Sequence, residues 1–258
     1  MPAFPSCLRL IALTSLLLAA GGMARAERVQ LRTEYHDTQP KFIQNEDGGF
    51  SGLCVELMRS IERQARIDFT HPAHFVPQKR IQADLAQGRI DVSCGLKKTA
   101  GRSTSLFFSE PLYTVAYMIL GRRDEPLRFN SIADLAALDQ EAPILSVQGS
   151  GSTQELRPRL QSLDDSARDV ETNLRKLLAG RGRVLVHYDL ALRYEIAQSA
   201  LSEQVMPVGQ NIEPYAHHLV FARHVDPALI ARIDAAIRTL KVNGEWQAIL
   251  ARYHATPP

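Results

Sequence analysis

The chain of 258 residues has only three cysteines, and its acidic and basic residues nearly balance. No two cysteines have the C-x-x-C spacing of a metal or redox site, and the G-x-S-x-G and H-E-x-x-H motifs are missing. After an apolar run near the N-terminus, no segment is long and apolar enough to span a bilayer. These absences argue against the enzyme and metal-site classes that such motifs mark.

Residues 1–26 have the features of a secretory signal peptide. A basic residue, Arg9, precedes a short apolar run, and Ala24-Arg25-Ala26 forms an A-x-A cleavage site. The apolar run is too short for a membrane anchor, which is the alternative interpretation. We therefore expect residues 1–26 to be removed and the mature chain to begin at Glu27.

Removal of this segment takes away two arginines and no acidic residue, so the mature chain has a formal net charge of zero. Such a balance argues against binding to nucleic acid or a polybasic role at a membrane. About 230 residues remain, enough for one large or two modest domains.

Cys54 and Cys94 remain in the mature chain as well. An oxidising compartment allows a disulfide between them, and two separately buried thiols are the alternative.

Strands and helices alternate along the chain, and one module occurs twice. Apolar residues over 53–65 repeat with the helical period. In the first half, a further helix ends at Gly88 and a buried strand follows at 90–94. In the second half, a helix ends at Gly180 and a buried strand follows at 184–188. The repetition predicts two similarly built α/β lobes.

Two apolar strands, at 115–120 and 217–222, are predicted to cross between the lobes, and the tail that follows is helical. We expect this tail to pack on the first lobe, so that the second lobe is an insertion hung on two strands. The expected boundaries are 27–118 and 219–258 for the first lobe and 119–218 for the second.

Several short motifs follow one another in a characteristic order. They are Pro40-x-Phe42, the stretch from Gly48 to Leu57, Gly88-x-Ile90-Asp91, Thr99-x-x-Arg102, the stretch from Phe108 to Tyr113, and Asn243-Gly244-Glu245-Trp246. Together they resemble the family 3 periplasmic solute-binding proteins, the amino-acid-binding receptors of ABC importers. The resemblance implies an α/β, type II periplasmic-binding-protein fold whose two lobes, joined by two hinge strands, close around a small ligand.

The same resemblance implies where the protein works and with what. We expect a periplasmic monomer that captures a small carboxylate-bearing ligand for an ABC permease in the inner membrane. Neither a cofactor nor nucleic acid is implied. Two alternatives remain open: a periplasmic enzyme on the same scaffold, similar to the cyclohexadienyl dehydratases, or a receptor that feeds a sensor.

In this family the arginine of the T-x-x-R motif binds the ligand's α-carboxylate, and Arg102 occupies that position. Thr99 is expected to cap the helix that begins there and to offer its hydroxyl to the ligand. Gly95 and Lys97 stand where family members often have small hydroxyl or neutral residues. A cation at Lys97 suits a second acidic group on the ligand, and a solvated lysine is the alternative.

Further ligand contacts are expected from both lobes. The loop after the first strand contributes Tyr35, for stacking on the ligand or for ordinary packing, and Glu34, for a ligand amine or for loop stability. On the second lobe, Ser152 and Thr153 lie in a segment similar to the family's G-[ST]-T, whose backbone amides open a helix. An ordinary glycine-serine turn with a helix cap is the alternative there.

Besides Gly95 and Lys97, the chain departs from the family pattern at one more place. Amino-acid binders usually place an ammonium-binding aspartate at the end of the second lobe's strand, where this chain has Tyr188, followed by Asp189. A one-residue bulge would restore the aspartate, and otherwise alternation turns it to the opposite face. Together with Lys97, this departure argues against a plain zwitterionic amino acid, and the expected ligand is an amino acid or a related organic acid. If the protein is an enzyme, Glu34 or Asp189 is the expected acid or base.

Overall fold

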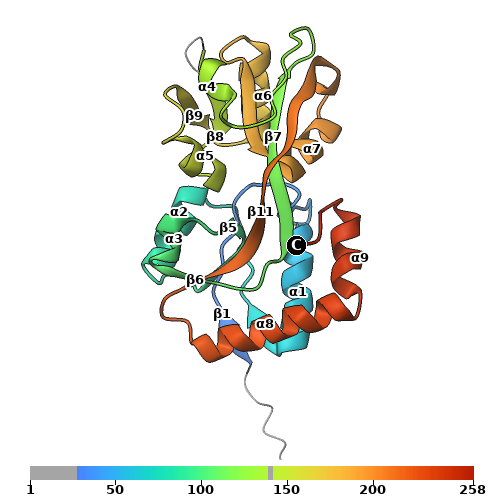
Figure 1. Ribbon diagram of the computed structural model, residues 1–258. Coiled ribbons are helices and arrows are strands. Elements are labelled where there is room, and N and C mark those ends of the chain that lie inside the picture. The colour runs from blue at the N-terminus through green and yellow to red at the C-terminus, as the bar shows by residue number, and fades with distance from the viewer. Residues whose placement is uncertain (1–27, 139–141) are drawn as a thin grey trace, which may run out of the picture.

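The computed structural model describes residues 28–138 and 142–258, so the predicted signal peptide lies outside the described residues. Figure 1 shows two α/β lobes, one above the other, with two long strands running through both. Those strands are β7 (Tyr113–Arg122) and β11 (Val205–Ala222). The chain passes from the lower lobe to the upper one along β7 and returns along β11.

The lower lobe is made of elements from both ends of the chain (Figure 1). They are β1 (Val29–Leu31), β2 (Ile43–Gln44), β3 (Phe50–Ser51), α1 (Leu53–Ala65), β4 (Ile67–Phe69), α2 (Gln78–Ala86), β5 (Val92–Lys97), α3 (Ala100–Ser103), β6 (Leu106–Phe108), α8 (Pro227–Val242) and α9 (Glu245–Arg252). The upper lobe is formed by the middle of the chain. Its elements are α4 (Leu135–Leu138), β8 (Ile144–Val147), α5 (Gly151–Leu156), β9 (Leu163–Ala167), α6 (Val170–Leu178), β10 (Val184–Tyr188), α7 (Asp189–Gln198) and a 3₁₀ turn at Ser202–Gln204.

One seven-stranded sheet extends through the molecule in the order β5-β11-β7-β10-β8-β9, with β6 also paired to β11. Strands β8, β9 and β10 pair in parallel, as expected when helices connect them, whereas β7 and β11 are antiparallel. Strands β1 and β4 form a separate parallel pair, and a bridge between Thr33 and Val92 joins the β1 segment to β5. Residues at the carboxyl ends of β5, β8 and β10 lie around one cavity.

Helix α1 forms as its apolar period predicts. The apolar residues of the repeating face are buried, namely Leu53, Leu57, Met58, Ile61 and Ala65. Helix α1 packs against α8 and α9, which follow the return strand β11. The indole of Trp246 in α9 is buried and donates a hydrogen bond to the carbonyl oxygen of Leu112 (2.8 Å). The C-terminal helices therefore pack on elements from the first part of the chain.

The buried apolar side chains form one cluster in the lower lobe, which also includes Tyr188, Leu190 and Ala191 of the upper lobe, and two further clusters within the upper lobe. Along β7, Tyr113 and Val115 belong to the lower cluster, whereas Tyr117 and Met118 belong to clusters of the upper lobe. Along β11, Ile212 belongs to the upper lobe. The boundaries at 118/119 and 218/219 remain a prediction about where the chain divides.

Strand β5 has a bulge at Gly95, opposite β11. His218 pairs with Leu96 and Leu219 pairs with Cys94, so Gly95 is the extra residue. Its φ of 74° lies in the left-handed region that glycine adopts without strain. Beside it, Cys54 of α1 and Cys94 of β5 form a disulfide with a Cα–Cα distance of 5.9 Å. The covalent link therefore holds α1 against the strand that leads into the region between the lobes.

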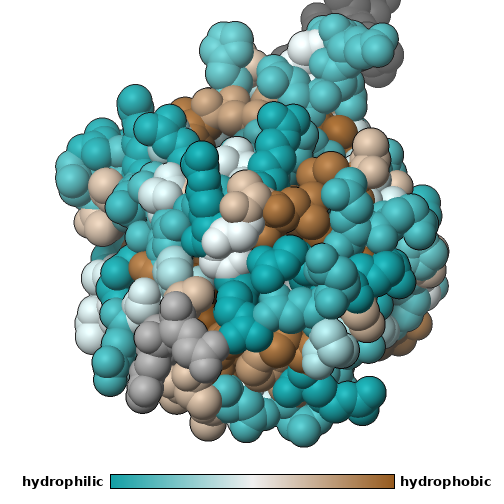
Figure 2. All heavy atoms as spheres, turned by 90° about the horizontal axis from the view of Figure 1, so that it is seen from above, coloured by the Kyte–Doolittle hydropathy of each residue, from teal (hydrophilic) through white to brown (hydrophobic). Residues whose placement is uncertain are grey.

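Within 28–138 and 142–258, no helix combines the length and apolar character needed to cross a membrane. Figure 2 shows the outer end of the upper lobe, where hydrophilic side chains cover most of the face and apolar ones lie between them.

Candidate functional site

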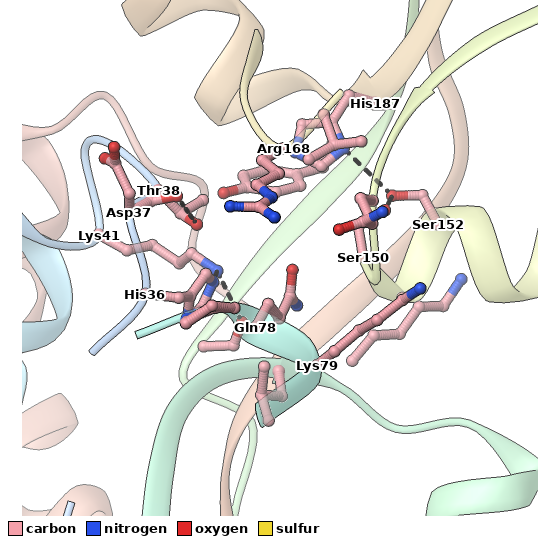
Figure 3. A pocket seen from close by; sticks show the side chains of 18 of the residues that line it. His36, Asp37, Thr38, Lys41, Gln78, Lys79, Ser150, Ser152, Arg168 and His187 are labelled. Carbon is pink, nitrogen blue, oxygen red and sulfur yellow. Dashed lines mark hydrogen bonds between the residues drawn. The ribbon is translucent and has the colours of Figure 1, made fainter. Parts of the chain in front are cut away.

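A cavity of about 330 Å³ lies between the two lobes. The first lobe lines it with residues from three segments: the loop after β1, the start of α2, and the stretch from β5 to α3. The second lobe adds the ends of β8, β9 and β10, and β11 contributes Tyr215 and His217. Such a volume suits a small organic ligand. In Figure 3, the side chains of Lys41 and Arg168 point into the cavity from different segments of the chain.

Arg102 lines the cavity and is 7% exposed. Its Nη1 donates to the carbonyl oxygen of Lys97 (2.8 Å), while Nε and Nη2 are buried and have no hydrogen-bond partner in the described protein. Burial lowers the pKa of Arg102 to about 10, so the guanidinium is charged at neutral pH. Two free donors on a charged fork match a bidentate carboxylate.

Thr99 has a capping role in the structure. Its hydroxyl accepts a hydrogen bond from the backbone N–H of Arg102 (3.3 Å), and it thereby caps α3. Thr99 is not among the residues that line the cavity. The expectation that its hydroxyl also reaches the ligand is therefore not supported, because that oxygen is turned to the backbone of the helix.

Lys97 lines the cavity, as expected, but its charge is already compensated. Its Nζ forms a salt bridge with Glu155 of α5 and donates to the hydroxyl of Tyr117 (3.1 Å). It also lies 3.8 Å from the centre of the Tyr215 ring, a cation–π arrangement. Because Glu155 belongs to the other lobe, this pair connects the lobes.

A second lysine lines the same cavity and was not singled out from the sequence. Lys41 is 2% exposed, and its Nζ donates to the carbonyl oxygen of Gly95 (3.2 Å) and lies 3.3 Å from Nε2 of His36. Its Nζ lies 5.2 Å from the centre of the Tyr188 ring. Burial and the charge of Arg102 lower the pKa of Lys41 to about 7.

Three histidines surround these cations. His36, His187 and His217 line the cavity and are all buried. Burial, and then the charge of Lys41, lower the pKa of each: to about 3 for His187 and well below its usual value for the other two. The imidazoles are therefore neutral at neutral pH and add polar contacts without charge.

The turn at the start of α5 contributes Ser150 and Ser152 to the cavity. Ser152 Oγ lies 3.3 Å from Nδ1 of His187, and Ser150 caps α5 by accepting the N–H of Thr153 (3.1 Å). The hydroxyl of Thr153 instead donates to the carbonyl oxygen of Val147 (2.6 Å). Thr153, an expected ligand contact, therefore holds the turn together and does not line the cavity.

Of the two roles expected for Tyr35, the structure favours ordinary packing. Its ring is fully buried in the first lobe, stacked on Phe42 at 4.3 Å, and its hydroxyl bonds to His71 (2.8 Å). The loop does face the cavity, but through His36 and Asp37, the next residues along the chain.

Glu34 also lies outside the cavity. Burial and the neighbouring Asp84 of α2 raise its pKa, and Arg80 and Arg89 lie close enough to oppose this effect. Its surroundings are thus those of a residue that stabilises the loop against α2, which was the alternative expectation.

At the end of β10, Tyr188 faces the cavity and Asp189 does not. The Asp189 carboxylate accepts hydrogen bonds from the backbone N–H groups of Ala116 (3.1 Å) and Leu190 (2.8 Å). No bulge restores the aspartate, and β10 pairs with β7 residue by residue as far as Tyr188. Asp189 is therefore not a replacement for the family's ammonium-binding aspartate.

Of the expected contacts, the cavity brings together Gly95, Lys97, Arg102, Ser152 and Tyr188. The main residues that sequence reasoning missed are Lys41, Arg168 and the three histidines. Lys41 did carry a signal, since it lies between Pro40 and Phe42 in one of the recognised motifs. Among the described residues, no three His, Cys, Asp or Glu side chains are grouped to hold a metal ion.

A family model for the bacterial extracellular solute-binding proteins, family 3, matches residues 31–256. The match spans most of the chain, and the chain belongs to this family. The resemblance seen in the sequence motifs is thereby confirmed. A search of curated proteins gave no match.

Solved structures support the two-lobe fold. A histidine kinase sensor domain with similarity to periplasmic binding proteins has a TM-score of 0.76 and 22% identity, over 90% of this chain and 98% of its own. An ancestral arginine-binding protein bound to arginine has a TM-score of 0.74 and 18% identity, over 88% and 98%. The ancestral amino-acid-binding protein AncCDT-1, a precursor of cyclohexadienyl dehydratase, has 0.72 and 17%, over 87% and 94%. At these identities the likeness concerns the fold.

Proposed function

We propose that this protein is a periplasmic receptor that captures a small carboxylate-bearing ligand between its lobes and delivers it to an ABC importer. One observation carries the proposal: Arg102 is almost fully buried, lines the cavity, and has two guanidinium nitrogens without a partner in the described protein. A buried charge is stable only when it is paired, and a carboxylate from the ligand supplies the pair.

The mechanism follows from the position of the site between the lobes. Arg102 of the first lobe holds the carboxylate, and Ser150 and Ser152 of the second lobe complete the cavity. A ligand that contacts both lobes binds the closed form better than the open form and so favours closure. The strands β7 and β11 are the proposed hinge, because the chain passes between the lobes along them.

The test begins with a thermal-shift screen of amino acids, dicarboxylates and aromatic acids, followed by calorimetry on the hits. Arg102→Ala should weaken binding of a hit at least tenfold, because a charge-assisted bidentate pair is lost. Arg232→Ala is a matched control. Arg232 is exposed on α8 and is not among the residues that line the cavity. Equal affinity of wild-type protein and Arg102→Ala would show that the assignment is wrong.

The enzyme alternative is tested in the same screen. The two carboxylates that the sequence offered as acid or base, Glu34 and Asp189, lie outside the cavity, which favours binding over catalysis. Each hit is incubated with the protein and its concentration followed. Turnover would place the protein among enzymes on this scaffold, whereas a ligand that stays intact supports a receptor.

A further inference from the structure

The cavity contains two buried cations that form no salt bridge within the described protein, and the carboxylate that acts on Arg102 from a distance, Glu155, is itself paired with Lys97. Arg102 is 7% exposed and Lys41 only 2%, and both line the cavity. Lys41 reaches only neutral groups, a backbone carbonyl and an uncharged imidazole.

Two carboxylates, Asp37 and Asp169, also line the cavity and offset part of its positive charge, whereas Lys79 at the start of α2 adds to it. Asp169 uses its carboxylate to cap α6 through Thr172, and burial followed by the charge of Asp169 raises the pKa of Asp37. The second lobe adds another cation, Arg168, whose exposed side chain points into the cavity with Lys41 (Figure 3). The interior therefore has an excess of positive charge that one monoanionic ligand would not neutralise.

The two buried cations are also close together. Lys41 Nζ donates to the carbonyl oxygen of Gly95 and Arg102 Nη1 to that of Lys97, two residues further along β5. Two residues of a strand span at most about 7 Å, and the charge of Arg102 acts on Lys41 closely enough to lower its pKa. One small molecule with two acidic groups on a short carbon chain reaches both.

We propose that the ligand is a dicarboxylate, with one carboxylate on Arg102 and the other on Lys41. This inference rests on the proposed function and narrows it to a class of ligand. It assigns to Lys41 the role that the sequence had suggested for Lys97, namely to bind a second acidic group. Because Asp189 is turned away, the proposal does not require an α-ammonium group on the ligand.

The test compares diacids with their half-amides, which have the same shape and one charge fewer. Calorimetry at pH 6.5 uses succinate, glutarate and adipate against succinamate, glutaramate and adipamate, and L-glutamate against L-glutamine. At least one diacid should bind ten or more times as tightly as its half-amide. In Lys41→Met this preference should fall below threefold, because the diacid weakens while the half-amide changes little.

Lys98→Met is the matched control. It removes the same charge from an exposed lysine that lies over the Phe108 ring, outside the cavity lining, and it should keep the full preference. Melting curves of both variants establish that they are folded. Arg102→Ala should weaken diacid and half-amide alike.

The outcomes separate the two proposals. If half-amides or other monocarboxylates bind as tightly as the diacids, or if Lys41→Met weakens both members of a pair equally, the dicarboxylate inference is wrong and the proposed function stands. The same holds if only monocarboxylates bind. If no carboxylate binds the wild-type protein, the proposed function is wrong and the inference falls with it.

Discussion

A buried lysine without a carboxylate partner lowers the stability of the ligand-free protein. Lys41 has its pKa lowered to about 7, by burial first and then by Arg102. In the unfolded chain a lysine titrates near pH 10.4, so between these pH values the unfolded state binds more protons. Lys41 therefore destabilises the folded protein most at and below pH 7. This destabilisation decreases as the pH rises from about 7 to about 10, so the free energy of unfolding increases over that range.

Lys41→Met should therefore stabilise the ligand-free protein. We expect the free energy of unfolding at pH 7 to rise by about 1 kcal/mol or more, since a desolvated charge is replaced by an apolar chain of similar length. The gain should shrink toward pH 10. Urea unfolding at pH 7 and pH 9.5 measures both effects. Lys98→Met should show neither, and a Lys41→Met protein that is less stable than wild type at both pH values would contradict the argument.

At the scale of residues, the sequence motifs identified site residues that stand within a known pattern. They did not identify residues that become neighbours of the site only in the folded chain. Arg102 was found because it stands in a recognised motif. Lys41 was not, because its role depends on contact with Gly95, 54 residues away in sequence. The sequence left two roles open for both Tyr35 and Asp189, because the face on which a loop or strand-end residue points depends on register, and one residue reverses it.

At the scale of elements, the bulge in β5 determines the shape of the site. A Cβ atom built on Gly95 would lie 2.7 Å from both Cδ of Lys41 and the hydroxyl of Tyr113, and 3.0 Å from Sγ of Cys54. The glycine lets the first-lobe strand pass close to the lysine and to the disulfide. The sequence marked Gly95 as unusual for the family, and the structure supplies the reason.

Gly95→Ala should be strongly destabilising. The new methyl group meets three close neighbours, and the backbone at a φ of 74° is strained for any residue with a Cβ. We expect a loss of about 2–3 kcal/mol in urea unfolding, with the ligand site disturbed as well. Gly101→Ala, where nothing lies within 4 Å of the added atom, is the control and should change little. Equal effects of the two substitutions would show that the close approach at Gly95 is unimportant.

Most elements could be predicted because their signals are local. The helical periods of α1 and α8, the proline after Asp226 that opens α8, and the strand near Cys94 all lie in short windows of sequence. The full length of β11 could not be predicted. The sequence indicated only its last part, at 217–222, because Pro207, Gly209 and Pro214 interrupt the apolar pattern within the strand, and pairing with β7 compensates for them.

At the scale of the whole molecule, polar contacts join the lobes beside the cavity. Gln82 of α2 donates to the carbonyl oxygen of Gly149 (2.8 Å) and accepts from Gln154 of α5 (2.7 Å). Together with the salt bridge between Lys97 and Glu155, these contacts stabilise the arrangement in which the lobes are close. Gln82 is not part of the cavity lining, so it acts on closure alone.

Gln82→Ala should weaken ligand binding without touching the ligand. Two hydrogen bonds that exist only when the lobes are close would be lost, each contributing about 1 kcal/mol or less. We expect a three- to tenfold loss in affinity, mainly through faster dissociation, measured by stopped-flow kinetics. Gln64→Ala removes the same side chain from an exposed position of α1 and should leave the rates unchanged. An unaltered dissociation rate in Gln82→Ala would mean that these contacts do not hold the lobes together.

The position of Trp246 has a consequence for spectroscopy. It is the only tryptophan of the chain, and its indole is buried in α9 against the start of β7, outside the cavity lining. Its fluorescence emission therefore reports on the integrity of the lower lobe and should shift to longer wavelength when that lobe unfolds. It should change little when a ligand fills the cavity, so intrinsic fluorescence follows denaturation well and ligand titrations need another signal.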